Sequence, residues 1–273
     1  MTILMCSDKI RVVDVNASNI DDLVLVCSFK KLDDPLHRMG MELKKKWVRD
    51  MLRSYGACAK IAYLGGIPCG QILYYDEELD PTVEKPREGA VRVQCIFTSR
   101  PEARRKGVAK ALLNHLLKDL GQPMACFGDR PCSFVFTNAF DTGEVFTQRR
   151  FFERAGFKEA EDDSDIVYYT VAGNYAFREA AQPRGTIDQD KGRAVLLYSP
   201  TCQFSFEFAK KAEAAIRAVE PKLPICVLNE WEHPSEAIKR TGEKIVLNAV
   251  PIRSFFLDED EFRREVERAL AAH

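Results

Sequence analysis

A strand, a basic turn containing glycine and an amphipathic helix follow one another between residues 91 and 120, and this order constrains the fold most. Val91–Thr98 is rich in β-branched and aromatic residues, which predicts a strand. Apolar residues recur at helical spacing over Val108–Leu120, and Gly121 ends that pattern. The order predicts a mixed α/β (α+β) fold rather than an all-helical or all-strand one.

Further elements surround this segment. Periodicity predicts strands over 10–15, 133–137 and 166–171, and helices over 19–31, 41–55 and 146–155. Strands predicted over 59–63 and 71–75 flank Leu64-Gly65-Gly66, a hairpin signal because glycine adopts the positive φ of tight turns. The first part of the chain is therefore predicted as a sheet with flanking helices.

The turn itself, Arg104-Arg105-Lys106-Gly107-Val108-Ala109, has the chemistry of an anion site. A helix N-terminus offers unpaired N–H groups and a partial positive charge, which together bind a pyrophosphate. Gly107 lets phosphates approach the backbone without a Cβ in the way, and the small Ala109 acts similarly. Arginine and lysine add charge. The alternative is a basic turn before an ordinary helix, because short motifs also occur by chance.

This stretch resembles the GNAT N-acetyltransferase superfamily. The family's strand-to-helix crossing has Gln or Arg, then Gly three positions later and Gly or Ala two positions after that, often with a proline upstream. Arg104, Gly107 and Ala109 match, and Pro101 stands where the proline is expected. A second match, QRRFFERAGFK over 148–158, resembles the family's short helix and Gly-Phe turn beside the pantetheine arm. The resemblance covers about Ile10–Val171.

The resemblance implies a GNAT-type mixed sheet flanked by helices, with acetyl-CoA as co-substrate. Backbone N–H groups at the end of the central strand would stabilise the developing oxyanion. Asn138 resembles a position that hydrogen-bonds the pantetheine arm, and its alternative role is to form a turn. Carried over residue by residue, the cofactor-binding positions are Phe97, Thr98, Ser99, Arg104, Arg105, Lys106, Gly107, Val108, Ala109, Asn138 and Phe152.

Phe152 departs from the family's pattern. Many members carry a tyrosine at this position, and its hydroxyl protonates the departing CoA thiolate. Phenylalanine cannot do so. Either another group acts as the donor, or the thiolate leaves unassisted, which its pKa of about 8.5 allows. Core packing is the alternative role of Phe152.

Direct transfer also needs a group that takes a proton from the acceptor ammonium. Glu144 and Asp141 lie in a long segment after Asn138 that should border the acceptor pocket. Cys95 lies on the central strand and is placed to face the thioester. The alternatives for these three residues are solvated acids and a buried thiol.

A polar, weakly periodic stretch over 173–192 predicts a linker. It divides the chain into an acyl-CoA-binding domain over 1–172 and a second domain over 193–273. In the second domain, periodicity predicts strands over 194–198, 225–228, 245–247 and 252–257, and helices over 204–219, 235–241 and 259–271.

This order resembles the thioredoxin-like fold. Residues 198–205 stand where the family has its redox motif, and Val250-Pro251 stands at its cis-proline loop. Cys202 precedes a predicted helix, whose dipole favours a thiolate, but the motif is C-x-x-S and forms no internal disulfide. A monothiol role competes with a domain used for packing or substrate recognition. The two domains in this order also resemble the YoaP-type group of acetyltransferases.

Composition excludes several function classes. The 40 Lys and Arg nearly balance the 41 Asp and Glu, which argues against nucleic acid or an anionic membrane as partner. The nine cysteines are scattered without C-x-x-C, and no signal peptide or long apolar stretch is visible, so we expect a cytoplasmic protein. The four histidines are widely separated, so we expect no metal site.

The leading expectation is an enzyme, an N-acetyltransferase that moves an acetyl group from acetyl-CoA to the amine of a small molecule or peptide. Transfer would be direct, in a ternary complex. The alternatives are a non-catalytic acyl-CoA sensor and a thiol-redox protein that works through Cys202. The acceptor and the oligomeric state stay open.

Overall fold

The computed structural model describes residues 9–123, 129, 132–139, 147–161, 165–173, 187–255 and 257–272. The chain forms two compact units. Unit 1 takes residues 1–30, 45–80 and 85–180, and unit 2 takes 31–44, 81–84 and 181–273. Two segments from the first third of the sequence therefore cluster with its C-terminal part, which no sequence pattern indicated.

Unit 1 is built on a seven-stranded mixed sheet in the order β1-β2-β3-β4-β5-β7-β6. Only the β4–β5 pair is parallel. The predicted mixed sheet with flanking helices is confirmed, and the sheet does not close into a barrel. The strands are β1 (Ile10–Asp14), β2 (Ala59–Leu64), β3 (Ile67–Asp76), β4 (Ala90–Thr98), β5 (Phe134–Asn138), β6 (Lys158–Glu159) and β7 (Ile166–Thr170).

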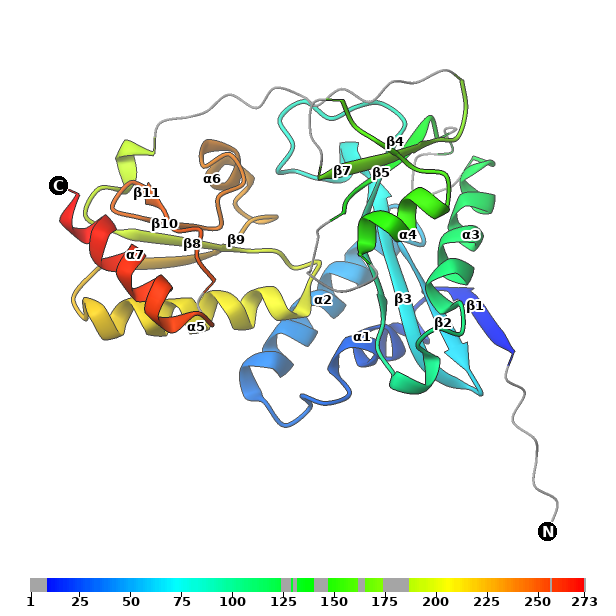
Figure 1. Cartoon of the computed structure of the whole chain (residues 1–273), viewed down its shortest axis with the longest axis horizontal. Helices are drawn as coiled ribbons and strands as arrows, with labels where there is room; N and C mark the ends of the chain where they lie inside the picture. Colours follow the sequence, from blue (N-terminus) through cyan, green and yellow to red (C-terminus); the bar gives the residue numbers. More distant parts are fainter. Residues whose placement is uncertain are drawn as a thin grey trace, which may run out of the picture. The chain divides into compact units, whose positions relative to one another are not determined.

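Helices cover both faces of this sheet (Figure 1). α3 (Val108–Leu120) and α4 (Gln148–Arg154) pack on one face and share an apolar core with β3, β4 and β5. α1 (Ile20–Ser28) lies on the other face. Leucines at helical spacing bury the inner side of α3, as its periodicity predicted.

α2 (Pro35–Ser54) begins earlier than the predicted helix over 41–55, so that predicted start was wrong. Asp34 Oδ1 accepts hydrogen bonds from the backbone of Leu36 at 2.9 Å and of His37 at 3.2 Å. An N-cap aspartate followed by proline is a standard helix start. Gly40, a poor helix former, obscured this signal in the sequence.

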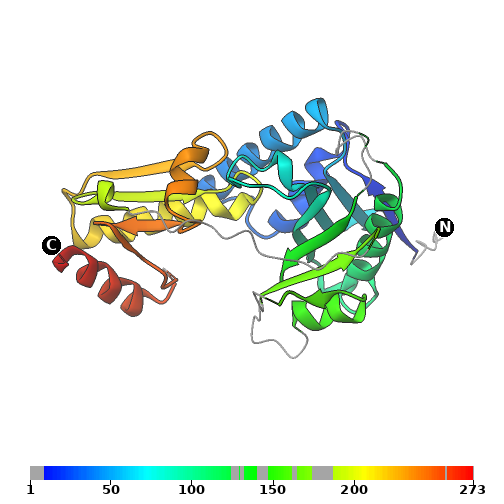
Figure 2. The same cartoon turned by 90° about the horizontal axis from the view of Figure 1, so that it is seen from above.

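Unit 2 has a four-stranded sheet in the order β11-β10-β8-β9, in which only β8 and β9 are parallel. α5 (Gln203–Val219) and α7 (Glu259–Ala271) pack on one face, and α6 (Pro234–Lys239) packs on the other (Figure 1, Figure 2). The strands are β8 (Ala194–Tyr198), β9 (Ile225–Asn229), β10 (Ile245–Leu247) and β11 (Val250–Pro251).

The strand predicted over 252–257 was wrong, because β11 lies at Val250–Pro251. Asn248 and Ala249 have φ of 50° and 62°, so they form a two-residue turn that returns the chain at once. The turn was not recognised because alanine rarely adopts positive φ. The bond between Val250 and Pro251 is trans, which differs from the cis-proline loop that the resemblance implied.

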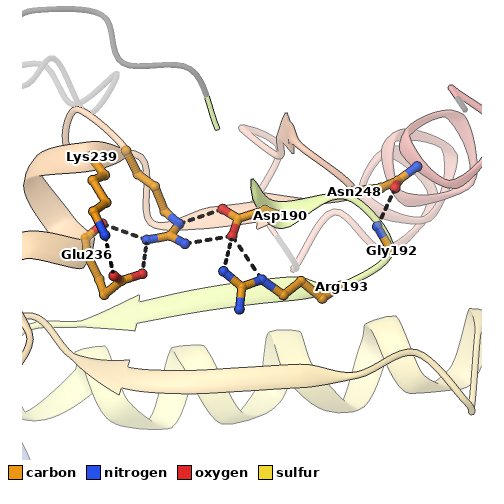
Figure 3. A network of polar contacts seen from close by, with 7 residues as sticks. Asp190, Gly192, Arg193, Glu236, Lys239 and Asn248 are labelled. Atoms are coloured by element: carbon orange, nitrogen blue, oxygen red, sulfur yellow. Dashed lines mark hydrogen bonds and ion pairs between the residues drawn. The ribbon is translucent and has the colours of Figure 1, made fainter. Parts of the chain in front are cut away.

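A buried ionic network fixes the start of the unit 2 sheet (Figure 3). The Arg240 guanidinium donates to both carboxylate oxygens of Asp190 at 2.7 Å, and both side chains are fully buried. Arg193 donates to the same carboxylate. Hydrogen bonds from Arg240 and Lys239 lower the pKa of Glu236. Asp190 and α6 are therefore tied together beside the entry to β8.

Candidate functional site

The two parallel strands at the centre of the unit 1 sheet diverge. β4 pairs with β5 only at Ala90, Val91 and Arg92, although β4 continues to Thr98. The Thr137 hydroxyl donates to the Val93 carbonyl at 2.8 Å and closes the paired part. Among the described strands, the second half of β4 therefore has a sheet neighbour on the β3 side alone.

Backbone pairing shows which amides of β4 face this opening. The Ser99 N–H donates to the Cys69 carbonyl at 3.0 Å. In an antiparallel pair, residues alternate between exchanging hydrogen bonds with the partner strand and pointing away from it. Phe97 therefore bonds toward β3, whereas the N–H groups of Ile96 and Thr98 point away from β3 and into the opening.

A β-bulge lies at the beginning of the divergent part. Cys95 lies opposite Leu73 and Val93 lies opposite Tyr74, so Gln94 is an extra residue in β4. A bulge bends its strand and re-aims side chains. It accounts for the departure of β4 from β5 directly after the paired segment.

The start of α3 is open. Its N-cap residue is Gly107, with φ of 84°, and no side chain caps the helix. The first N–H groups of a helix have no partner within it. The turn before α3 is exposed and carries Arg104, Arg105 and Lys106. Arg105 has φ of 61°, a left-handed conformation that is unusual for a residue other than glycine.

Gly70 brings the helix start close to the end of β4. It lies opposite Thr98 in the sheet, and a Cβ on Gly70 would lie 2.6 Å from Cγ1 of Val108. Real Cβ atoms do not approach so closely, so glycine permits this contact. The first turn of α3 and the divergent end of β4 are therefore neighbours.

Thr98 carries an unusual polar atom. Its hydroxyl oxygen is buried and has no hydrogen-bond partner in the described part of the chain. A buried polar group without a partner is costly, and most such groups in native proteins bond to protein or to ordered water. The Thr98 hydroxyl is therefore a buried polar group at the end of β4 whose hydrogen bond the described protein does not supply.

The structure brings several of the predicted cofactor-binding residues close together. Thr98, Gly107 and Val108 lie around the Gly70 contact, and Ala109 follows in the first turn of α3. Ser99 lies at the same end of β4, but its backbone N–H bonds to Cys69. Burial raises the pKa of the Cys69 thiol, although Arg100 acts in the opposite direction.

Other predicted residues lie elsewhere. Phe152 is 1% exposed in the core and packs against Phe157, with ring centroids 5.0 Å apart. Phe97 is an exposed surface residue. Asn138 ends β5, and its side-chain oxygen accepts a hydrogen bond from Arg92 at 3.4 Å. Glu144 and Asp141 lie outside the described residues.

Cys95 lies on the α1 side of the sheet. The buried Gln71 amide donates toward Cys95 Sγ at 3.8 Å and toward Cys27 Sγ at 3.4 Å. Both thiols are half-buried. The pattern of the sequence did not reveal this cluster, because Cys27, Gln71 and Cys95 come from three different elements.

Cys202 belongs to unit 2, where it is exposed at the N-cap position of α5. The turn around it is bonded to itself. The Ser199 N–H donates to the Ser205 hydroxyl, and the Ser199 and Thr201 hydroxyls bond to one another, each over 2.9 Å. Ser205, in the position of a second redox cysteine, therefore supports the turn.

Sequence reasoning missed the backbone of Ile96 and the side chains of Gln94, Tyr75 and Asp80. Tyr75 Oη lies 3.1 Å from both Gln94 Oε1 and Asp80 Oδ2. A bulge and a strand register leave no clear pattern in one sequence. The run of acidic residues after Tyr75 is a weak signal, because it is typical of any solvated turn.

In the described part of the chain, no group of three or more histidine, cysteine or acidic side chains could hold a metal ion. Within the same residues, no helix combines the length and the apolar character needed to cross a bilayer.

Comparison with known proteins gives similarity in structure only. No family model and no curated protein matches the chain. Among solved structures, Ard1 from Thermoplasma volcanium is 14% identical, with 60% of this chain and 99% of that chain covered and a TM-score of 0.37. The PaiA N-acetyltransferase from Thermoplasma acidophilum, in complex with coenzyme A, is 13% identical, with 59% and 99% covered and a TM-score of 0.41. A GNAT family acetyltransferase from Brucella melitensis, in complex with acetyl-CoA, is 11% identical, with 62% and 92% covered and a TM-score of 0.40.

Proposed function

We propose that the chain is an acetyl-CoA-dependent N-acyltransferase that moves an acetyl group to the amine of a small molecule or peptide. One observation carries the proposal: the divergent end of β4 directs amides into an opening beside the uncapped start of α3. Such an arrangement offers a phosphate site and an oxyanion site next to each other.

The residues at the opening fit the cofactor in two respects. The N–H groups at the start of α3, with Arg104, Arg105 and Lys106 before it, would bind the diphosphate. The pantetheine arm carries amides, which can bond with strand backbone and with the Thr98 hydroxyl. Asn138 at the end of β5 is proposed to contact the same arm from the other strand.

In the proposed reaction, the neutral amine attacks the thioester carbonyl and the C–S bond to CoA breaks. The N–H groups of Ile96 and Thr98 face the opening and would stabilise the negative charge on the carbonyl oxygen. Phe152 has no hydroxyl and is buried, so the CoA thiolate leaves without help from this residue. Glu144 is proposed as the group that accepts the amine's proton, with Asp141 as the alternative.

We further propose the division into a GNAT domain over 1–172, a linker over 173–192 and a thioredoxin-like domain over 193–273. The order β11-β10-β8-β9 with one parallel pair, and helices on both faces, supports the second domain. The association of residues 31–44 with this part adds a segment to it. The same proposal includes the order of the two domains, an acetyltransferase domain followed by a thioredoxin-like domain, as in the YoaP-type group.

A second candidate function concerns Cys202, whose exposed thiol lies at the start of α5. The alternative activity is a monothiol reaction with a low-molecular-weight disulfide. A mixed disulfide forms as the Cys202 thiolate attacks one sulfur and the other sulfur leaves as a thiolate. Reaction with oxidised glutathione no faster at Cys202 than at the exposed Cys226 would exclude this activity.

The main proposal is tested by placing a carboxylate at the diphosphate site. Gly107→Glu should raise the Kd of acetyl-CoA about 100-fold, equivalent to about 3 kcal/mol. Gly242→Glu is the matched control, because Gly107 and Gly242 have φ of 84° and 81° and a Cβ on either meets nothing within 4 Å. Titration calorimetry measures both variants.

Activity is followed as thiol release from acetyl-CoA in the presence of a panel of primary amines and peptides. Acetylated product that disappears in Gly107→Glu and persists in Gly242→Glu supports the enzyme. Acetyl-CoA binding without product from any amine favours the sensor. Equal acetyl-CoA affinity in wild type and Gly107→Glu contradicts both.

A further inference from the structure

The bulge in β4 turns two consecutive side chains to one face of the sheet. Neighbours in a regular strand point to opposite faces. Here Gln94 contacts Tyr75 and Cys95 contacts Gln71, over 3.1 and 3.8 Å. Tyr75 and Gln71 are four residues apart on β3 and so share a face. Gln94 and Cys95 therefore both lie on that face.

This face is the one opposite α3. Gln71 also contacts Cys27 of α1, and the Trp47 ring of α2 packs edge-on against Tyr75 with centroids 5.9 Å apart. The core that α3 shares with the sheet contains Val91 and Val93 of β4 instead. A ligand with its phosphates at α3 that passes through the opening would present its reacting end here.

The donors and acceptors around the Tyr75 hydroxyl determine the orientation of the Gln94 amide. The Tyr75 hydroxyl has one proton but lies 3.1 Å from both Asp80 and Gln94. The Asp80 carboxylate can only accept, so the Tyr75 proton goes to Asp80. Gln94 must then offer its NH₂ group to the hydroxyl oxygen, because amide O and N positions are assigned by the network. The Gln94 carbonyl oxygen is thereby turned away from Tyr75.

We propose that Gln94 and Cys95 form the acceptor side of the site, and this proposal rests on the proposed acetyl transfer. The Gln94 oxygen accepts a hydrogen bond from the N–H of an incoming primary amine. Tyr75, 1% exposed, is a positioning residue that sets the orientation of the amide. Cys95 limits the size of the adjoining group. Asp80 contacts Tyr75, and Arg92 lies opposite Tyr75 in the sheet, so this face carries one negative and one positive charge. Charge alone therefore does not select the amine, and the proposed selection depends on the hydrogen bond to Gln94.

Two thiol reagents with the same charge test this assignment at Cys95. 2-Aminoethyl methanethiosulfonate carries an ammonium with N–H donors, and 2-(trimethylammonio)ethyl methanethiosulfonate carries none. Peptide mass spectrometry gives the labelling rate at each cysteine, and the exposed Cys226 of unit 2 is the internal reference. We expect the ratio of the two rates to be about 2- to 10-fold higher at Cys95, the range for one hydrogen bond.

Gln94→Leu should bring the ratio at Cys95 down to that at Cys226, and Tyr75→Phe should give an intermediate value. Exclusion of the bulkier reagent by size would survive in Gln94→Leu, so an unchanged ratio overturns the proposal. If circular dichroism shows that Gln94→Leu does not fold, Tyr75→Phe decides in the same way. Acetyl-CoA binding is measured separately by calorimetry. Its absence refutes the proposed function, whereas binding with an unchanged ratio refutes only the role of Gln94.

Discussion

In the described residues, α3 and α5 each connect a pair of parallel strands, and the turns that lead into these two helices differ. The turn between β4 and α3 has a glycine N-cap, no side-chain cap and exposed cations. In the turn between β8 and α5, serine and threonine hydroxyls bond to one another and to the backbone. Residues 31–44 also pack on α5, since a Cβ on Gly40 would lie 2.0 Å from the Gln203 carbonyl oxygen.

The two turns differ in the groups that surround the helix start. Every helix start has N–H groups outside the regular helical pairing and carries the positive end of the dipole, so these features alone do not separate the two turns. In unit 2 the surrounding protein uses this position for packing, whereas in unit 1 a buried Thr98 hydroxyl and divergent amides remain beside it. A helix N-terminus is therefore informative only together with the groups around it.

Gly40 tests how tightly residues 31–44 pack against the start of α5. Gly40→Val should destabilise unit 2 by about 3 kcal/mol or more, because the Gln203 carbonyl is backbone and cannot move aside. Hydrogen exchange of peptides from β8 and α5 reports unit 2 alone. Met39→Val, at an exposed neighbour on the same helix, is the control for helix propensity. Equal hydrogen-exchange protection in the two variants would mean that Gly40 does not pack closely against the Gln203 carbonyl.

A buried carboxylate, Glu207 of α5, also bonds to residues 31–44, through Lys31 and His37. Burial raises the pKa of Glu207, but hydrogen bonds outweigh this effect and lower it from 4.5 to about 2; they come from Lys211, Lys31 and His37. A lowered folded-state pKa stabilises the protein above pH 4.5, and this stability, about 3 kcal/mol, is lost as the pH falls toward 2.

Glu207→Gln should therefore lower the free energy of unfolding by about 2 to 3 kcal/mol at pH 7 and flatten its dependence on pH between about 4.5 and 2. Urea unfolding at a series of pH values measures both effects. Glu213→Gln, on the same helix but paired with the part-exposed Lys210 and Arg217, is the control. A slope in Glu207→Gln as steep as in wild type would contradict the assignment.

Thr98 tests whether the end of β4, beside the start of α3, binds a ligand. Thr98→Val removes the buried hydroxyl that has no partner in the described part of the chain, so the free protein should gain about 1 kcal/mol. Acetyl-CoA affinity should fall about 2- to 10-fold, because one hydrogen bond is lost. Thr137→Val is the contrast, since its hydroxyl bonds to Val93 and its loss should destabilise. The opposite signs of stability and affinity are what distinguish a ligand-binding hydroxyl.

The smallest effect concerns backbone strain in the two units. Arg105 and Ala249 have φ of 61° and 62°, so glycine at either position should stabilise by about 0.5 kcal/mol after its own entropy cost. Only Arg105→Gly should also weaken acetyl-CoA binding, through the lost cation. Thermal unfolding and calorimetry compare the two variants. Equal acetyl-CoA affinity would remove Arg105 from the phosphate site.

Much of the fold could be predicted from the sequence. β8, β10 and α7 have the predicted bounds, because their apolar residues repeat at a clear period and turn residues flank them. The errors lay where local signals conflicted. Gly40 obscured the beginning of α2, and Ala249 obscured the turn before β11.

The candidate site also contains residues that the sequence predicts and residues that it does not. The start of α3 was predictable from Arg104 and Gly107, because the residues of a basic glycine turn are continuous in sequence. Gln94, Tyr75 and Asp80 were not predictable, because a bulge brings them together across two strands. Phe152 shows the reverse, since a residue chosen by its position in a motif packs in the core.

The order of strands and helices and the basic glycine turn follow from the amino-acid sequence alone, because periodicity and turn chemistry act over a few neighbouring residues. Three features are visible only in the three-dimensional structure. β4 separates from β5 after Arg92, and the N–H groups of Ile96 and Thr98 point into the opening. Residues 31–44 cluster with unit 2. These features depend on strand register and on contacts between distant segments, whose energies no local pattern encodes.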